Sequence, residues 1–91
     1  MNEKLIDKKL VEGVKKLGGL ALKFWTVSFS GFPDRMIIMP GAKVEFVELK
    51  TTGKKPSPIQ SKVHGMLRKF GFKVPVIDTQ ILLDEFLNTL K

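Results

Sequence analysis

The segment from residue 43 to residue 50 limits the possible folds more than any other part of the sequence. Its residues, KVEFVELK, include the β-branched and aromatic types that favour a strand. Because strand side chains alternate between two faces, Glu48 and Lys50 share one face with Val44 and Phe46. A carboxylate and an ammonium therefore continue an otherwise apolar face, where a buried charge costs free energy unless it is paired or binds a metal.

A second strand is expected immediately upstream. Residues 35–39 form a short apolar run, and the turn-forming residues 40–42 separate it from the first segment. The resulting β-hairpin brings Asp34, which precedes its first strand, towards Glu48. Two carboxylates are hard oxygen ligands, so together with water they indicate a Mg²⁺ site. The structural alternatives are that Asp34 only begins a turn and that Glu48 and Lys50 only form a salt bridge at a strand end.

Three other segments have the apolar spacing of amphipathic helices. Residues 2–17 end before a pair of glycines, and residues 58–70 follow the N-cap residue Ser57. The last helix begins after Asp78 or Thr79. The residues expected to face the core are Ile6, Leu10, Val14 and Leu17 in the first helix, Ile59, Val63, Met66, Leu67 and Phe70 in the second, and Ile81, Leu82, Phe86 and Leu90 in the third.

Two more strands complete the pattern. Residues 20–29 are rich in strand-forming types, with Trp25 and Phe29 on one face for core packing. Residues 72–77 contain Pro75, which favours a sheet edge or a bulge. The order α-β-β-β-α-β-α over 91 residues predicts a single α/β domain, 1–91, with a mixed sheet flanked by helices.

The charge balance points to a nucleic-acid partner. Sixteen Lys and Arg against nine Asp and Glu give a net charge of +7, and such a basic surface typically faces nucleic acid or an anionic membrane. No membrane association is expected, because no apolar run approaches the roughly 18 residues needed to span a bilayer. The absence of cysteine excludes disulfides and thiolate metal sites and fits a reducing cytoplasm.

Several motifs, taken in order, resemble the virus-type replication-repair nuclease (VRR-NUC) branch of the PD-(D/E)xK nuclease superfamily. They are a glutamate on the first helix, Gly31-Phe-Pro-Asp-Arg35, Val47-Glu-Leu-Lys50 and Ser57-Pro-Ile-Gln60. A Glu-x-Lys motif alone carries little weight, but the ordered set is specific and covers nearly the whole chain. The resemblance implies a restriction-endonuclease-like αβββαβ core and a metal-dependent nuclease.

The resemblance also assigns roles to individual residues. Asp34, Glu48 and the carbonyl of Leu49 would hold Mg²⁺, for which Mn²⁺ can substitute. Lys50 would orient or activate the attacking water and stabilise the developing charge on the phosphate. Gln60 would support the site from the second helix, although Ser57-Pro-Ile-Gln60 is also a capping box.

The first-helix glutamate of the family matches best at Glu3, three residues before Ile6, with Glu12 as the alternative. Asp7 stands where the family often has glutamine. A glutamate near a helix N-terminus is also favoured by the helix dipole, so Glu3 has a purely structural interpretation as well.

Other polar residues have roles on the DNA side. Lys54 and Lys55 directly follow the metal-binding strand and are expected to hold phosphates. Arg35 is either a partner for Asp34 or a phosphate contact. His64, the only histidine, is expected at a surface or boundary position of the second helix.

The expected function is metal-dependent, structure-specific hydrolysis of DNA phosphodiester bonds by an endonuclease in replication or repair. The resemblance adds branched DNA, such as four-way (Holliday) junctions, and a homodimer that presents two sites to two strands. The alternatives are a non-catalytic nucleic-acid-binding module and an exonuclease that acts at ends or flaps. The expected location is the cytoplasm of a bacterial or phage-infected host cell.

Overall fold

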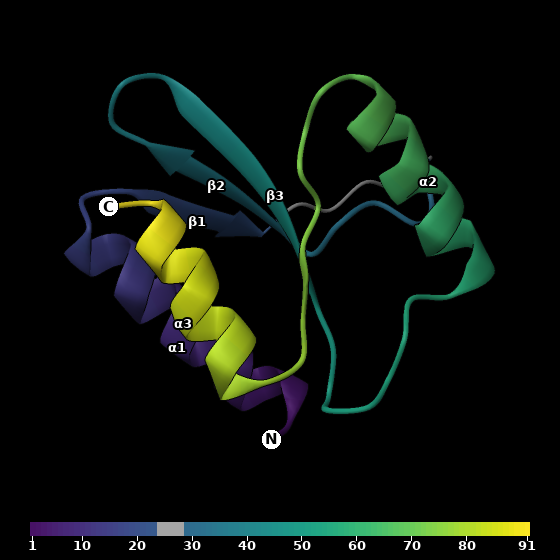
Figure 1. The fold of residues 1–91 in the computed structure, drawn as a ribbon, viewed down its shortest axis with the longest axis horizontal. Coiled ribbons are helices and arrows are strands. Elements are labelled where there is room, and N and C mark those ends of the chain that lie inside the picture. Colours follow the sequence, from purple (N-terminus) through teal and green to yellow (C-terminus); the bar gives the residue numbers. More distant parts are fainter. Residues whose placement is uncertain (24–28) are drawn as a thin grey trace.

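The computed structural model describes residues 1–23 and 29–91. Within these residues, no helix is long and apolar enough to cross a membrane. The elements follow one another in the predicted order (Figure 1). They are α1 (Glu3–Lys16), β1 (Leu20–Lys23), β2 (Arg35–Met39), β3 (Lys43–Leu49), α2 (Pro58–Lys69), β4 (Val76–Ile77) and α3 (Gln80–Thr89).

The strands form one mixed sheet in the order β1-β2-β3-β4. β2 pairs antiparallel with β1 and with β3, whereas β3 pairs parallel with β4. The predicted hairpin is therefore confirmed, with Met39 opposite Lys43 beside its turn. β4 is an edge strand, and Pro75 immediately precedes it. This position suits a proline, which has no N–H to give to a neighbouring strand.

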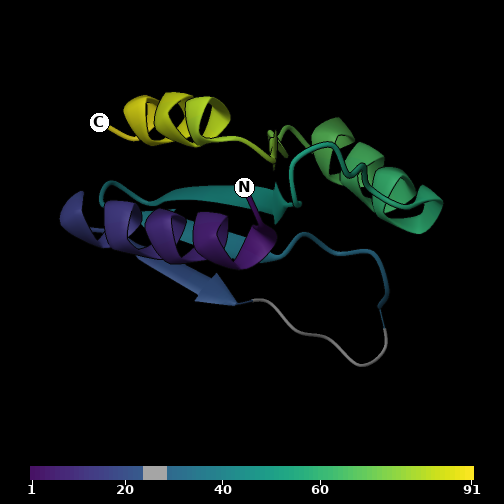
Figure 2. The same cartoon turned by 90° about the horizontal axis from the view of Figure 1, so that it is seen from below.

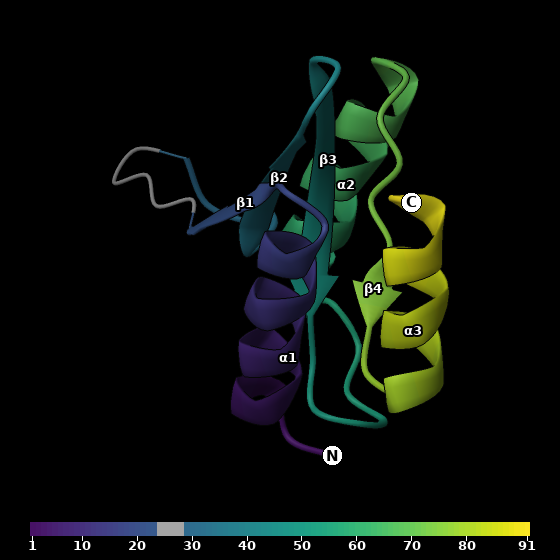
Figure 3. The same cartoon turned by 90° about the vertical axis from the view of Figure 1, so that its left-hand side faces the viewer.

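Helices cover both faces of this sheet (Figures 2 and 3). On one face, α1 and α3 pack side by side, and Gly13 of α1 leaves room for the side chain of Leu87. On the other face, α2 packs against a smaller cluster. The first cluster contains Ile6, Leu10, Val14, Ile37, Met39, Val47, Leu49, Ile77, Leu83, Phe86 and Leu90, and the second contains Phe46, Val63, Leu67 and Val74.

The inward face of α2 differs from the predicted one. Val63 and Leu67 are buried as expected, but the apolar side chains of Ile59, Met66 and Phe70 are exposed. The buried face is rotated about the helix axis towards His64, which is itself buried. Apolar spacing alone does not show that a polar residue lies at the centre of the contact.

The inward face of α3 also differs in part. Phe86 and Leu90 are buried as predicted, whereas Ile81 and Leu82 are exposed and Leu83 takes their place. Three consecutive large apolar residues fit more than one helical face, and packing against α1 selects among them.

The strand predicted at 72–77 is too long, and the one predicted at 20–29 is described only in part. β1 contains Leu20–Lys23, and Phe29 is exposed outside any strand. Residues 24–28, which include Trp25, lie outside the described residues. The later strand contains only Val76 and Ile77. Residues 72–77 have strand-forming composition, but a strand also requires a neighbouring strand for its backbone hydrogen bonds.

An ion pair connects α1 to the sheet. The Nε and Nη2 atoms of Arg35 donate to the two carboxylate oxygens of Asp7, each at 2.8 Å, and Nη1 donates to the carbonyl of Ala21 at 3.1 Å. The hydrogen bonds to Asp7 raise the pKa of Arg35. This bidentate pair is geometrically specific, so it fixes the position of α1 over β1 and β2.

We expect Asp7→Asn to lower the free energy of unfolding by about 1–3 kcal/mol, because it leaves a largely covered guanidinium without its counter-charge. Urea denaturation measures this loss. Glu12→Gln, the same change at an exposed position of the same helix, should stay within about 0.5 kcal/mol of the wild type. Equal effects of the two variants would show that the ion pair adds nothing beyond surface charge.

Candidate active site

The hairpin brings Asp34 and the end of β3 together. Asp34 immediately precedes β2, and its Oδ2 atom accepts a hydrogen bond from the backbone N–H of Leu49 at 2.8 Å. Glu48 is the preceding residue of β3, so the two predicted acidic residues lie in the same place. Its carboxylate points to the α2 face of the sheet, as the strand alternation predicts.

The loop before Asp34 is held against the start of α2. Gly31 has a φ of 87°, and a Cβ atom there would lie 2.7 Å from the carbonyl oxygen of Ile59. A side chain would therefore meet both a strained backbone conformation and the backbone of α2. Pro33 is fully buried next to Asp34. This close approach positions Asp34 at the sheet.

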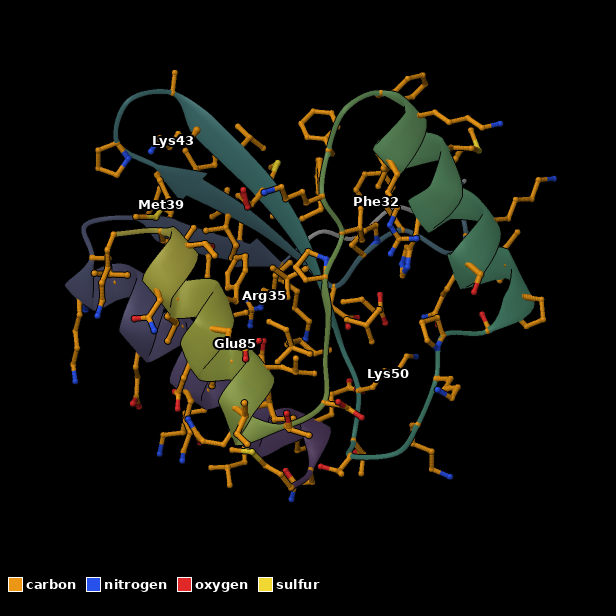
Figure 4. The ribbon with its side chains drawn as sticks, viewed as in Figure 1. Phe32, Arg35, Met39, Lys43, Lys50 and Glu85 are labelled. Carbon is orange, nitrogen blue, oxygen red and sulfur yellow. The ribbon has the colours of Figure 1, made fainter. Side chains whose placement is uncertain are left out.

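Glu48 is buried, with 1% of its surface exposed. Its Oε2 atom lies 3.4 Å from Nζ of Lys50 and accepts a hydrogen bond from Nε2 of Gln60 at 3.3 Å. Its Oε1 atom lies 3.4 Å from Nε2 of His64. The predicted residues Asp34, Glu48, Lys50 and Gln60 therefore meet at one place. Figure 4 shows Lys50 at the opposite end of β3 from Lys43.

Burial raises the pKa of Glu48 to about 7, and the negative charge of Asp34 and a hydrogen bond with its carboxyl group add to the effect. Lys50 acts in the opposite direction but does not cancel the shift. The single ammonium is thus insufficient to neutralise two neighbouring carboxylates. A site with this imbalance favours the binding of an additional cation.

The donor set suits a hard divalent cation. Asp34 and Glu48 supply carboxylate oxygens, and the backbone carbonyl of Leu49 lies between Glu48 and Lys50 in the chain. Among the described residues, no group of three or more His, Cys, Asp or Glu side chains is placed to hold a metal ion. Two carboxylates would therefore depend on the carbonyl and on water for the remaining ligands, as Mg²⁺ sites commonly do.

Gln60 makes the contacts expected for both of the roles considered for it. Its Oε1 atom accepts the backbone N–H of Ser57 at 2.9 Å, and the hydroxyl of Ser57 accepts the N–H of Gln60 at 3.2 Å. The capping box is thus complete. Because the Nε2 atom of the same side chain donates to Glu48, the helix cap also orients the side chain that contacts this carboxylate.

The remaining predicted residues lie outside this cluster of contacts. The side chain of Glu3 is exposed, although its backbone N–H donates to the hydroxyl of Thr51 in the loop after β3. Glu12, the alternative, lies farther along α1 and is also exposed. Lys54 and Lys55 are exposed in that same loop.

The guanidinium of Arg35 pairs with Asp7 and with the carbonyl of Ala21, and not with Asp34 as one of its two interpretations predicted. Arg35 begins β2 on the same face as Ile37 and Met39, so it lies on the α1 side of the sheet.

His64 belongs to the site, although the sequence pattern indicates a surface or boundary position. Only 1% of its side chain is exposed, and it lies against Glu48. It follows Gln60 by one helical turn, so both side chains lie on one face of α2. That spacing is the sequence signal that could have placed it.

A mixed sheet with helices on both faces, a Pro-Asp before one strand and a Glu-x-Lys at the end of the next define a PD-(D/E)xK-type nuclease. No family model matches the sequence. The chain is 43% identical over 82 residues to "Putative nuclease p44" of Acyrthosiphon pisum secondary endosymbiont phage 1, a match that covers 90% of this chain and 88% of that protein.

The fold is similar to that of a solved structure described as a VRR_NUC domain, with a TM-score of 0.90 and 32% sequence identity. The match covers 98% of this chain and 97% of the other. The chain therefore belongs to the VRR-NUC family of nucleases.

The raised pKa of Glu48 predicts a pH dependence of stability in metal-free buffer. The folded protein holds the Glu48 proton up to about 7, whereas the unfolded chain releases it near 4.5. Stability from this group is therefore complete below the lower value and is lost as pH rises towards the upper one. Between about pH 5 and about pH 8, the free energy of unfolding of Glu48→Gln should therefore rise by roughly 1–3 kcal/mol relative to that of the wild type.

Urea unfolding of both proteins at the two pH values measures this difference. Glu45→Gln, on the other face of the same strand, is the matched control and should show no such gain. A difference between Glu48→Gln and the wild type that is independent of pH would contradict the prediction.

Proposed function

We propose that the protein is a metal-dependent DNA endonuclease that hydrolyses phosphodiester bonds in branched DNA such as four-way junctions. The observation that carries this proposal is the convergence of Asp34 with Glu48 and Lys50 at one end of the hairpin. A buried carboxylate that shares its surroundings with a second carboxylate and only one ammonium is suited to a divalent cation. Membership of a nuclease family supplies the reaction class.

Four residues of the site have direct roles in the proposed reaction. Asp34, Glu48 and the carbonyl of Leu49 would hold Mg²⁺ or Mn²⁺, which when bound polarises a phosphate oxygen as a Lewis acid. Lys50 is held 3.4 Å from Glu48, so its ammonium is oriented before substrate arrives. From that position it orients the attacking water and stabilises the negative charge that develops on the phosphate.

The proposed preference for branched DNA follows from the small size of the chain and from its family resemblance. A domain of 91 residues has little surface for reading base edges, so recognition of DNA shape is favoured over recognition of sequence. The net charge of +7 supplies attraction for phosphates that does not depend on sequence. A homodimer would place two such sites against two strands of a junction.

Cleavage of a labelled four-way junction tests the reaction, with linear duplex and single strand as comparison substrates and with Mg²⁺, Mn²⁺ or EDTA. We expect junction cleavage that requires a divalent cation and that falls by at least about 100-fold in Asp34→Asn and in Lys50→Ala. Lys43→Ala is the matched control, because Lys43 lies exposed at the other end of β3 (Figure 4). This variant should cleave like the wild type.

Each alternative result would lead to a different conclusion about the activity. Binding of DNA without cleavage of any substrate would indicate a non-catalytic binding module. Cleavage that needs free ends, and spares a covalently closed substrate, would indicate an exonuclease. Equal cleavage of junction and linear duplex would contradict the branched-DNA preference and leave the nuclease assignment intact.

Lys54 and Lys55 are the proposed phosphate contacts beside the site. Because both are exposed in the loop that follows β3, replacing both with alanine should weaken binding to every DNA and leave cleavage at saturating DNA nearly unchanged. The slope of log affinity against log salt should decrease in magnitude by about 2, roughly 1 for each lost phosphate contact.

The double variant of Lys15 and Lys16 is the matched control for this experiment. These exposed neighbours lie in the last turn of α1, at the opposite end from Glu3, whose backbone contacts the loop after β3. Salt slopes that change equally in both double variants would show that Lys54 and Lys55 only add to the overall charge.

A further inference from the structure

One contact of the site is not explained by the roles assigned above. Oε1 of Glu48 and Nε2 of His64 lie 3.4 Å apart, and each side chain is only 1% exposed. Within the described part of the chain, neither atom has a hydrogen-bond partner. Buried polar atoms are rarely left unpaired, so two of them facing each other indicate a direct interaction.

The other oxygen of Glu48 is already held. Lys50 and Gln60 both lie against Oε2. A carboxylate held through one oxygen can still turn about its last side-chain bond, because a torsion between tetrahedral and planar carbons has broad minima. Contact with the second oxygen fixes the plane of the group. His64 is placed to provide that contact.

The chemistry of the two groups fits such a contact. A neutral imidazole has one N–H donor and one acceptor nitrogen, whereas an ionised carboxylate only accepts. The tautomer that carries its hydrogen on Nε2 is therefore the one that suits Glu48.

We propose that His64 is a positioning residue, whose Nε2–H donates to Oε1 of Glu48 and fixes the carboxylate in the orientation that binds the divalent cation. The second part of this statement rests on the proposed function. The role is that of an outer partner, which touches a ligand and not the ion. The rival explanation is that His64 only fills space between α2 and the sheet, beside Val63 and Leu67.

The tautomer of His64 tests the hydrogen bond without any metal. Because His64 is the only histidine, its imidazole signals in a ¹⁵N-labelled protein belong to one residue. In metal-free buffer at about pH 8, where Glu48 is ionised, we expect the Nε2-protonated tautomer, with an N–H that exchanges slowly with solvent. A predominant Nδ1-protonated tautomer would overturn the proposal, because Nε2 could not then donate to Glu48.

The affinity for Mn²⁺, measured by calorimetry without DNA, tests the effect on the site. His64→Leu removes the donor and keeps an apolar side chain of similar bulk, so we expect about 10- to 100-fold weaker binding. His64→Gln can place an amide N–H near the position of Nε2 and should stay within about threefold of the wild type, since the hydrogen bond is retained.

The two variants together separate positioning from packing. Equal affinities in the wild type and both variants would overturn the positioning role, as would equal losses in both. If His64→Leu does not fold, His64→Asn gives the same comparison, because its shorter amide does not reach Glu48. If the wild type binds no divalent cation, the proposed function fails, and the tautomer alone decides whether His64 holds Glu48.

Discussion

The burial of the Glu48 carboxylate is the constraint on which the site depends. An ionised carboxylate with 1% of its surface exposed has lost most of its hydration, and it must recover that free energy from neighbouring groups. Lys50 comes from the same strand, and Gln60 and His64 come from α2. The position of α2 is therefore determined by polar contacts as well as by the cluster around Phe46. This explains why its inward face includes a histidine and excludes three large apolar residues.

The two faces of the sheet differ in the residues that they hold. The α1 and α3 face contains the larger apolar cluster, and it also holds the ion pair between Arg35 and Asp7. The α2 face holds the charged site. Strand alternation produces this division, because Val47 faces the larger cluster and the next residue, Glu48, faces α2. Asp34 and Arg35 are also neighbours in sequence, but Asp34 contacts the site and Arg35 contacts α1.

Those parts of the fold that depend on local chemistry could be predicted from the sequence. The hairpin follows from two short strands and a turn, and the start of α2 follows from the Ser57 cap. The meeting of Asp34 and Glu48 follows from the hairpin. The faces of α2 and α3, the short β4 and the burial of His64 depend on which surfaces meet in three dimensions. Arg35 is similar, because its partner Asp7 is distant in sequence and its charge fits several roles.

The capping box at Ser57 shows how stability and chemistry are combined in a chain of this length. A small domain has few residues that serve only one purpose, because it buries a smaller fraction of its surface than a large domain does. Gln60 closes the first turn of α2 through Oε1 and reaches Glu48 through Nε2. The helix therefore cannot shift along its axis without disturbing its own cap. In this way, a hydrogen bond that begins a helix also sets the position of a side chain in the candidate active site. His64 lies one turn later on the same face of the helix, so its position depends on the same cap.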